Sequence, residues 1–373
     1  MRVPLLDLTE QYQQLKPEID QALDPLIARQ QFTLGPEVAS LEKEMSTYCG
    51  TRFAIGVSSG TDAILLTLTA LGITSGDEVV TTPFTFFATA GVVSRLGAKP
   101  VFADIEPDSF NINPEKAKDM ITGKTKVILP AHLFGRCASM GLLLELAKDR
   151  DISVVEDAAQ AIGATVSLGK AGAIGDAGCF SFFPTKNLGA FGDAGMIITK
   201  NKELGDRLRK LRVHGEGAQY IHEEVGGNFR LDAIQAAILR VKLNYLDKWG
   251  KRRLENARFY NSLFREADLF EKNIVVPETP EGRHVFHQYV IRARKRDALR
   301  AYLKEREVQT GVYYPRPLHL QPCFQYLGYR EGDFPESEKA CHEVLALPIY
   351  PELTRKAQEY VVQAIQDFYL LKK

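Results

Sequence analysis

The sequence lacks an excess of charge of either sign. Its 47 lysine and arginine residues balance 47 aspartate and glutamate residues, so the formal net charge is +0 at pH 7. A balanced chain has no basic field for a long phosphate backbone or an anionic lipid surface, and we therefore expect neither nucleic acid nor membrane as a partner. An anionic ligand would have to be bound by a few local groups.

Cysteine pairs and long apolar runs are also missing. The five cysteines are an odd set without a Cys-x-x-Cys pair, which argues against a disulfide framework or a zinc ribbon and favours a reducing compartment. Neither His284-x-x-His287 nor Cys341-His342 has companions at metal-ligand spacing, so we predict no metal site. No run of about 18 apolar residues occurs, and Asp7 comes too early for the apolar core of a signal peptide. These features predict a cytoplasmic protein.

Short apolar runs alternate with helical periods over residues 52–199. This alternation is typical of βα units around a mainly parallel sheet, whose carboxyl ends form the functional edge. The predicted strands are Phe53–Val57, Glu78–Thr82, Pro100–Phe102, Lys126–Pro130, Ile152–Glu156, Gly178–Phe182 and Met196–Thr199. We therefore expect a doubly wound α/β domain here.

Two domains are expected because 373 residues exceed the usual size of one hydrophobic core. We place the boundary near Leu246, which gives a large domain over residues 1–246 and a smaller α+β domain over 247–373. A helical period from residue 233 through 264 predicts one long bent helix across this boundary. Further predictions are packing helices after Pro17 and Pro36, at 18–29 and 37–48, a strand at 285–291, and helices at 297–305 and 356–368.

One buried strand ends in a carboxylate, and a later glycine-rich turn carries a lysine. The segments read Ile152-Ser-Val-Val-Glu-Asp157 and Ser181-Phe-Phe-Pro-Thr-Lys186-Asn-Leu-Gly189. A lysine amine whose pKa is lowered by burial can condense with an aldehyde, and an aspartate opposite it can keep a pyridine nitrogen protonated. Lys186 and Asp157 together therefore predict pyridoxal 5′-phosphate catalysis. Taken singly, Lys186 could be a surface charge and Asp157 a helix N-cap.

A cradle for the cofactor phosphate is predicted at Ser59-Gly60-Thr61-Asp62, where a strand ends and an apolar helix begins. Free N–H groups at such a helix start bind anions, although the same residue types also cap helices that bind no ligand. Ser181 could add a hydroxyl to the same phosphate. Phe86 could stack on the cofactor ring or pack in the core beside its neighbouring phenylalanines.

The sequence resembles the DegT/DnrJ/EryC1/StrS family of sugar aminotransferases over nearly its whole length. The similar segments are Pro4–Leu8, Ser59–Asp62, Glu156–Gln160, Ser181–Lys186, Gly227–Asp232, Tyr313–Pro315 and Leu347–Pro348. The resemblance implies the aspartate-aminotransferase fold (fold type I), with a mainly parallel seven-stranded sheet in the large domain and a smaller α+β C-terminal domain. It also implies pyridoxal 5′-phosphate as the cofactor.

The resemblance implies a role for each matching residue. Lys186 would be the Schiff-base lysine, Asp157 the partner of the pyridine nitrogen, and Gln160 a hydrogen-bond partner near the ring oxygen. Phe86 would lie on the ring, at a position where relatives often have tyrosine or tryptophan. The residues implied around the phosphate are Gly60, Thr61, Asp62 and Ser181.

Sites in this family form between two subunits, so the resemblance implies a homodimer. The segment with Asn228 and Arg230 resembles the part that reaches the neighbour's phosphate, and we choose Asn228 for this contact. Tyr314, Arg316 and His319 resemble the loop that closes over a nucleotide-linked sugar, although they could also form an ordinary hydrogen-bonded loop.

The segment from Lys186 to Gly195 resembles the subgroup that aminates the 3-oxo position of a dTDP- or UDP-linked sugar. The implied reaction takes the amino group from glutamate. Three alternatives are a 4-oxo-sugar aminotransferase, a non-catalytic cofactor-binding regulator of the same fold, and a sugar dehydratase in which histidine replaces the lysine. Lys186 disfavours the dehydratase, and the presence of both Lys186 and Asp157 weighs against the regulator.

Overall fold

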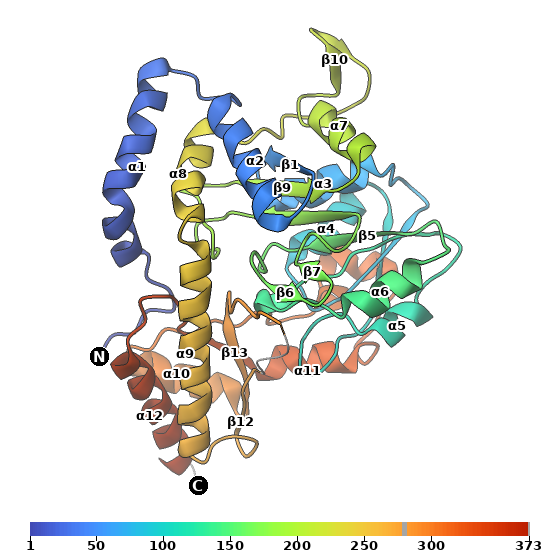
Figure 1. Cartoon of the computed structure of the whole chain (residues 1–373). Helices are drawn as coiled ribbons and strands as arrows, with labels where there is room; N and C mark the ends of the chain where they lie inside the picture. Colours follow the sequence, from blue (N-terminus) through green and yellow to red (C-terminus); the bar gives the residue numbers. More distant parts are fainter. Residues whose placement is uncertain (278–281, 372–373) are drawn as a thin grey trace.

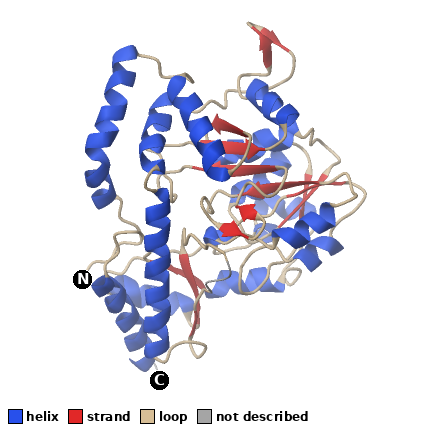
Figure 2. Ribbon diagram, in the orientation of Figure 1, coloured by secondary structure: helices blue, strands red, loops and turns tan. Residues whose placement is uncertain are grey.

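The runs predicted as strands form one seven-stranded sheet in the order β1-β9-β8-β5-β4-β2-β3. The structure is a computed structural model that describes residues 1–277 and 282–371. Strand β9 is antiparallel to both of its neighbours and the other pairs are parallel, so the sheet is mainly parallel, as predicted (Figure 2). The strands are β1 (Phe53–Val57), β2 (Glu78–Thr81), β3 (Lys99–Phe102), β4 (Thr125–Ile128), β5 (Ser153–Asp157), β8 (Ala177–Ser181) and β9 (Gly195–Thr199).

Helices cover both faces of this sheet because consecutive strand residues point to opposite sides, as Val154 and Val155 do. Helices α3, α4 and α7 pack on the Val155 face. On the opposite face, α2 and α8 cover the end with β1 and β9, and α5 and α6 cover the end with β4 and β2. The bounds are α2 (Pro36–Cys49), α3 (Gly60–Ala70), α4 (Phe87–Arg95), α5 (Pro114–Asp119), α6 (Met140–Ala147), α7 (Lys202–Leu211) and α8 (Ala233–Leu243).

The first helix, α1 (Thr9–Arg29), starts earlier than Pro17 predicts, so the predicted start at residue 18 is wrong. Pro17 and Pro25 both lie inside the helix, where each removes a backbone donor. Packing of Leu15 and Ile19 against α8 and Trp249 stabilises the helix despite these losses. Helix α2 begins at Pro36, as predicted.

The single helix predicted across residues 233–264 is also wrong, because the chain forms two helices there. Helix α8 ends at Leu243, and α9 (Leu246–Glu266) begins after a short turn. In that turn, the Asn244 side chain donates a hydrogen bond of 3.3 Å to the Arg240 carbonyl, a local bond that competes with helix continuation. Helix α9 then runs from the large sheet into the C-terminal part (Figure 1).

The C-terminal part contains an antiparallel sheet of β12 (Ile274–Val275), β13 (Tyr289–Ala293) and β14 (Val344–Leu347). The strand predicted at 285–291 starts later, because residues 287 and 288 line a cavity instead. Helices α9, α10 (Arg296–Glu305) and α12 (Arg355–Leu371) surround the core of this part, and α11 (Pro335–Glu343) packs on β13.

Short elements complete the described chain. They are β6 (Thr165–Val166), β7 (Gly169–Lys170), β10 (Glu216–Ala218), β11 (Ile221–His222), η1 (Leu133–Gly135), η2 (Leu318–Leu320) and η3 (Pro322–Leu327). No helix within residues 1–277 and 282–371 has both the length and the apolar character needed to cross a membrane. The division near Leu246 stays a prediction: α9 begins there, but Val3 from the chain start packs in the C-terminal core.

Candidate active site

A cavity of about 590 Å³ lies beyond the carboxyl ends of β4, β5 and β8, next to the start of α3. Parallel strands deliver their final residues to one edge of a sheet, so segments far apart in sequence meet there. The residues that follow β13 and those near residue 314 close the cavity from the C-terminal part. Among the predicted site residues, the structure brings together Gly60, Thr61, Phe86, Asp157, Gln160, Ser181, Lys186 and Tyr314.

Lys186 lies in a tight turn after β8. The turn closes with a hydrogen bond of 2.8 Å from the Lys186 N–H to the Phe183 carbonyl. Gly189 follows closely against Pro184, because a Cβ at Gly189 would lie 2.3 Å from the Pro184 carbonyl oxygen. The buried Lys242 donates a hydrogen bond to the Gly189 carbonyl and anchors the same turn on α8. The position of the lysine is therefore fixed by backbone packing.

No described residue forms a hydrogen bond with the Lys186 amine, and the side chain lines the cavity. Burial lowers the pKa of Lys186 to about 8, and the opposite charge of Asp157 acts against that decrease. A free amine fraction near neutral pH is what a nucleophile toward an aldehyde needs.

Asp157 is the last residue of β5 and is buried with 7% of its surface exposed. The Thr89 hydroxyl donates to its Oδ2 at 2.7 Å, and the Ala159 N–H donates to its Oδ1 at 3.2 Å. Both bonds fix the direction of the Asp157 side chain. The arrangement can hold a protonated ring nitrogen beside Asp157 in the cavity.

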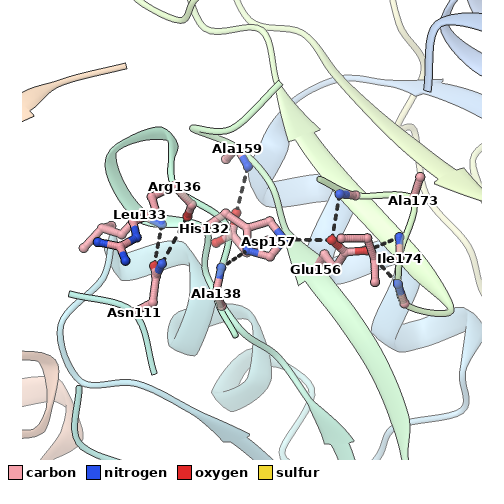
Figure 3. Close-up of polar contacts among 12 residues, drawn as sticks. Asn111, His132, Leu133, Arg136, Ala138, Glu156, Asp157, Ala159, Ala173 and Ile174 are labelled. Atoms are coloured by element: carbon pink, nitrogen blue, oxygen red, sulfur yellow. Dashed lines mark hydrogen bonds and ion pairs between the residues drawn. The ribbon is translucent and has the colours of Figure 1, made fainter. Parts of the chain in front are cut away.

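The preceding residue, Glu156, forms a fully buried network on the other side of the strand (Figure 3). Its two oxygens accept the N–H groups of Gly172, Ile174 and Gly175 and the His132 ring nitrogen Nε2, each at 2.7 Å. The Ala138 N–H donates to His132 Nδ1 at 3.1 Å, so the ring proton belongs on Nε2. This network holds the end of β5, and therefore Asp157, against two loops.

Helix α3 presents backbone N–H groups to the cavity. Ser59 is its N-cap: the Ser59 hydroxyl oxygen accepts the Asp62 N–H at 3.0 Å, and the Asp62 carboxylate in turn accepts the Ser58 and Ser59 hydroxyls. Asp62 thus organises the turn, while Gly60 and Thr61 line the cavity. Gly60 packs so closely on β8 that a Cβ there would lie 2.6 Å from the Ser181 Cβ.

Aromatic side chains form the outer wall. Phe86 is 56% exposed, and its ring centroid lies 6.4 Å from that of Tyr314. The amide of Gln160 donates to the Tyr314 hydroxyl at 3.2 Å, and its oxygen accepts the Phe134 N–H at 2.7 Å. The exposed face of Phe86 is therefore available for stacking, whereas Phe84 is buried in the core.

Three predicted residues lie away from this cavity. Asn228 forms an isolated bridge with Val213, and Arg316 is exposed, so their roles stay predictions. His319 is 1% exposed, its Nε2 lies 3.0 Å from Glu338 Oε1, and its ring packs 4.7 Å from that of Phe334. The ring is therefore part of a packed cluster beneath the loop, and its contact with a substrate stays a prediction.

The structure adds residues that the sequence interpretation did not place in the site. Thr89, in the first turn of α4, donates a hydrogen bond to Asp157, and Ala159 lines the cavity beside it. His287 and Gln288 enter from the C-terminal part. These contacts depend on how distant segments pack, which the local sequence pattern does not specify.

The chain matches the DegT/DnrJ/EryC1/StrS aminotransferase family over residues 13–366. It belongs to that family.

Individual relatives cover the chain almost completely. A pleiotropic regulatory protein of Geobacillus stearothermophilus is 52% identical over 99% of both chains. The dTDP-3-amino-3,4,6-trideoxy-alpha-D-glucose transaminase of Streptomyces venezuelae is 40% identical, with 98% of this chain and 96% of the relative covered. The crystal structure of S. venezuelae DesV in complex with a ketimine intermediate is 40% identical, with a TM-score of 0.94 over 98% of each chain. The fold is therefore that of the fold type I aminotransferases, as predicted.

Aminotransferases of the DegT/DnrJ/EryC1/StrS family use pyridoxal 5′-phosphate, and the described residues fit this cofactor. No described residue forms a hydrogen bond with the Lys186 amine, Asp157 is held in place by Thr89, and Gly60 allows the start of α3 to pack directly against Ser181 at the cavity wall. Lys186 would hold the aldehyde carbon, Asp157 the ring nitrogen, and Gly60, Thr61 and Ser181 the phosphate.

Replacing Glu156 with glutamine tests the buried network. The substituted amide nitrogen would face N–H donors, so we expect Glu156→Gln to lower the free energy of unfolding by about 3 kcal/mol. Urea titration measures this change. The exposed Glu145 supplies the control, because Glu145→Gln should leave the stability unchanged. Equal stability of the two variants would contradict the role of the network.

Replacing Gly60 with alanine tests the phosphate cradle. The new Cβ would force α3 away from Ser181, so we expect a loss of about 1–3 kcal/mol in stability and weaker cofactor binding. Fluorescence titration of the apoprotein with cofactor gives the dissociation constant. Gly123 has no atom within 4 Å of an added Cβ, and Gly123→Ala should bind normally. Normal binding by Gly60→Ala would refute the cradle.

The lowered pKa of Lys186 predicts how cofactor capture depends on pH. With a pKa of about 8, roughly one tenth of the amine is unprotonated at pH 7. The rate at which the apoprotein captures cofactor should rise with pH and level off above pH 8, as followed by visible absorption in stopped flow. A rate that keeps rising toward the ordinary lysine value of 10.5 would show that the amine is not perturbed.

Proposed function

We propose that the protein transfers an amino group from glutamate to the 3-oxo position of a dTDP- or UDP-linked keto sugar, in the biosynthesis of an amino sugar. The observation that carries this proposal is the unpartnered Lys186 amine in one cavity with the fixed Asp157 carboxylate. The choice of a nucleotide-linked 3-oxo sugar is supported by the similarity to the S. venezuelae transaminase, whose name specifies a dTDP-linked 3-amino sugar.

Each site residue has a defined task in this proposal. When bound, the cofactor would supply an electron sink next to the donor amino acid. Lys186 Nζ would accept the proton from the donor Cα and return it, a transfer worth about 10²–10⁴ in rate. Asp157 keeps the ring nitrogen charged, and the wall formed by Phe86 and Tyr314 faces the sugar. The cavity volume of about 590 Å³ is large enough for the cofactor ring and part of a substrate.

The proposal includes a second copy of the chain. Asn228 lies away from the cavity of its own chain, which is compatible with contact at the neighbour's phosphate in a homodimer. Arg316, on the exposed loop beside Tyr314, would approach the sugar nucleotide from outside. Sedimentation of the holoenzyme should give twice the chain mass of 41.6 kDa, and a monomeric active enzyme would refute this part.

Two other functions remain as candidates. A 4-oxo-sugar aminotransferase would use the same Lys186 and Asp157, because the position of the sugar changes and the cofactor chemistry does not. A regulator is suggested by the name of the G. stearothermophilus relative. The arrangement of Lys186 and Asp157 favours turnover, since binding alone does not require a perturbed amine aimed into a cavity.

A substrate panel distinguishes these functions. The holoenzyme should be incubated with glutamate and with dTDP- and UDP-linked 3-oxo and 4-oxo sugars while 2-oxoglutarate is measured. We expect 2-oxoglutarate with a 3-oxo sugar and none with the Lys186→Ala variant, whereas Lys202→Ala, on the exposed start of α7, should match the wild type. Formation only with 4-oxo sugars would support the alternative acceptor. Bound cofactor without any 2-oxoglutarate would support the regulator.

A further inference from the structure

A smaller cavity of about 120 Å³ adjoins the active-site cavity. The two cavities share Thr185, His287, Gln288 and Tyr313 in their walls, and Thr185 directly precedes Lys186. The inner wall of the smaller cavity includes Arg253, from the first half of α9. A small molecule in this space would therefore lie next to the reacting lysine.

Arg253 is a buried cation with one edge unused. It is 3% exposed, and its Nη1 donates to the carbonyls of Phe286 at 3.1 Å, His287 at 3.4 Å and Ile349 at 3.0 Å. Its Nε is enclosed by protein atoms and has no partner, and no described residue accepts a hydrogen bond from Nη2. Nη2 is therefore the nitrogen of this guanidinium that remains for a carboxylate in the cavity.

The charge around this guanidinium favours an anion. Glu352 is the acidic group that acts on Arg253, yet no ion pair joins them within the described chain. Burial lowers the pKa of Arg253 to about 10, which still leaves it charged at neutral pH. Burial, Lys186 and Arg253 lower the pKa of His287 well below its ordinary value, so this ring is neutral. Because Glu352 lies beyond ion-pair distance, a carboxylate in direct contact with Arg253 would add to the stabilisation of this buried cation.

We propose that Arg253 binds a carboxylate of the amino donor in the smaller cavity through Nη2. This assignment rests on the proposed function, because it names where the donor amino acid is held. A volume of about 120 Å³ suits a short aliphatic carboxylate and excludes a sugar nucleotide, which is left to the larger cavity. Recognition by a buried guanidinium also explains selection of an acidic donor over a neutral one.

Glutarate, a dicarboxylate without an amine, is a direct probe of this site. Isothermal titration of glutarate into the holoenzyme should show binding by the wild type, at least about tenfold weaker binding by Arg253→Met, and intermediate binding by Arg253→Lys. Arg252→Met is the matched control on the same helix, because Arg252 is exposed and lies outside both cavities. Equal glutarate affinity in the wild type and a folded Arg253 variant would overturn the proposal.

Kinetics separate this proposal from the proposed function. Arg253→Lys should raise KM for glutamate at least about tenfold while KM for the keto sugar stays unchanged. A wild type that binds glutarate through Arg253 but forms no 2-oxoglutarate would refute the function and keep the carboxylate site. If neither Arg253 variant folds, a crystal structure of the wild type with glutarate tests the proposal instead. A carboxylate oxygen within hydrogen-bond distance of Nη2 supports the proposal, and glutarate bound elsewhere overturns it.

Discussion

The burial of an unpartnered amine beside a fixed carboxylate is the constraint on which the site depends. Removing the Lys186 amine from water disfavours its charged form, while Asp157 favours it, and the balance leaves a pKa of about 8. That balance requires both groups to stay in place. Lys186 is held by a turn that packs against Pro184 and α8. Asp157 is held by hydrogen bonds from Thr89 and Ala159 and by the network around Glu156.

The site also joins the two halves of the chain. The end of β5 supplies Asp157 and the turn after β8 supplies Lys186, while His287 and Tyr314 close the cavity from the C-terminal part. Helix α9 extends from one half to the other and carries Arg253, whose Nη1 ties the segments at Phe286 and Ile349 together (Figure 1). The same side chain can thus hold the wall of the cavity and leave Nη2 for a ligand.

The local sequence pattern was sufficient to predict the sheet and to place Asp157 and Lys186 together at its edge, because strand ends and a glycine-rich turn are formed by contiguous residues. The local pattern gave wrong predictions where contacts between segments far apart in the sequence determine the structure. Pro17 is tolerated inside α1 because the apolar face of that helix packs on α8, and Asn244 ends α8 through a bond to its own helix. The burial of His319 by Glu338 and Phe334, from a separate segment, is also a contact that the local pattern does not specify. Arg253 follows Lys251 and Arg252 in the sequence. These two side chains are exposed, whereas Arg253 is buried.

The central claim, that Lys186 is the lysine that binds the cofactor, can be measured directly. Lys242 is the other candidate for the lysine that binds the cofactor, because burial lowers its pKa to about 8 as well. Its amine, however, already donates a hydrogen bond to the Gly189 carbonyl. Borohydride reduction of the holoenzyme, followed by proteolysis and mass spectrometry, shows which lysine carries the cofactor. The structure predicts that the label lies on the peptide containing Lys186. A label on Lys242, or on no lysine, would contradict the proposed site.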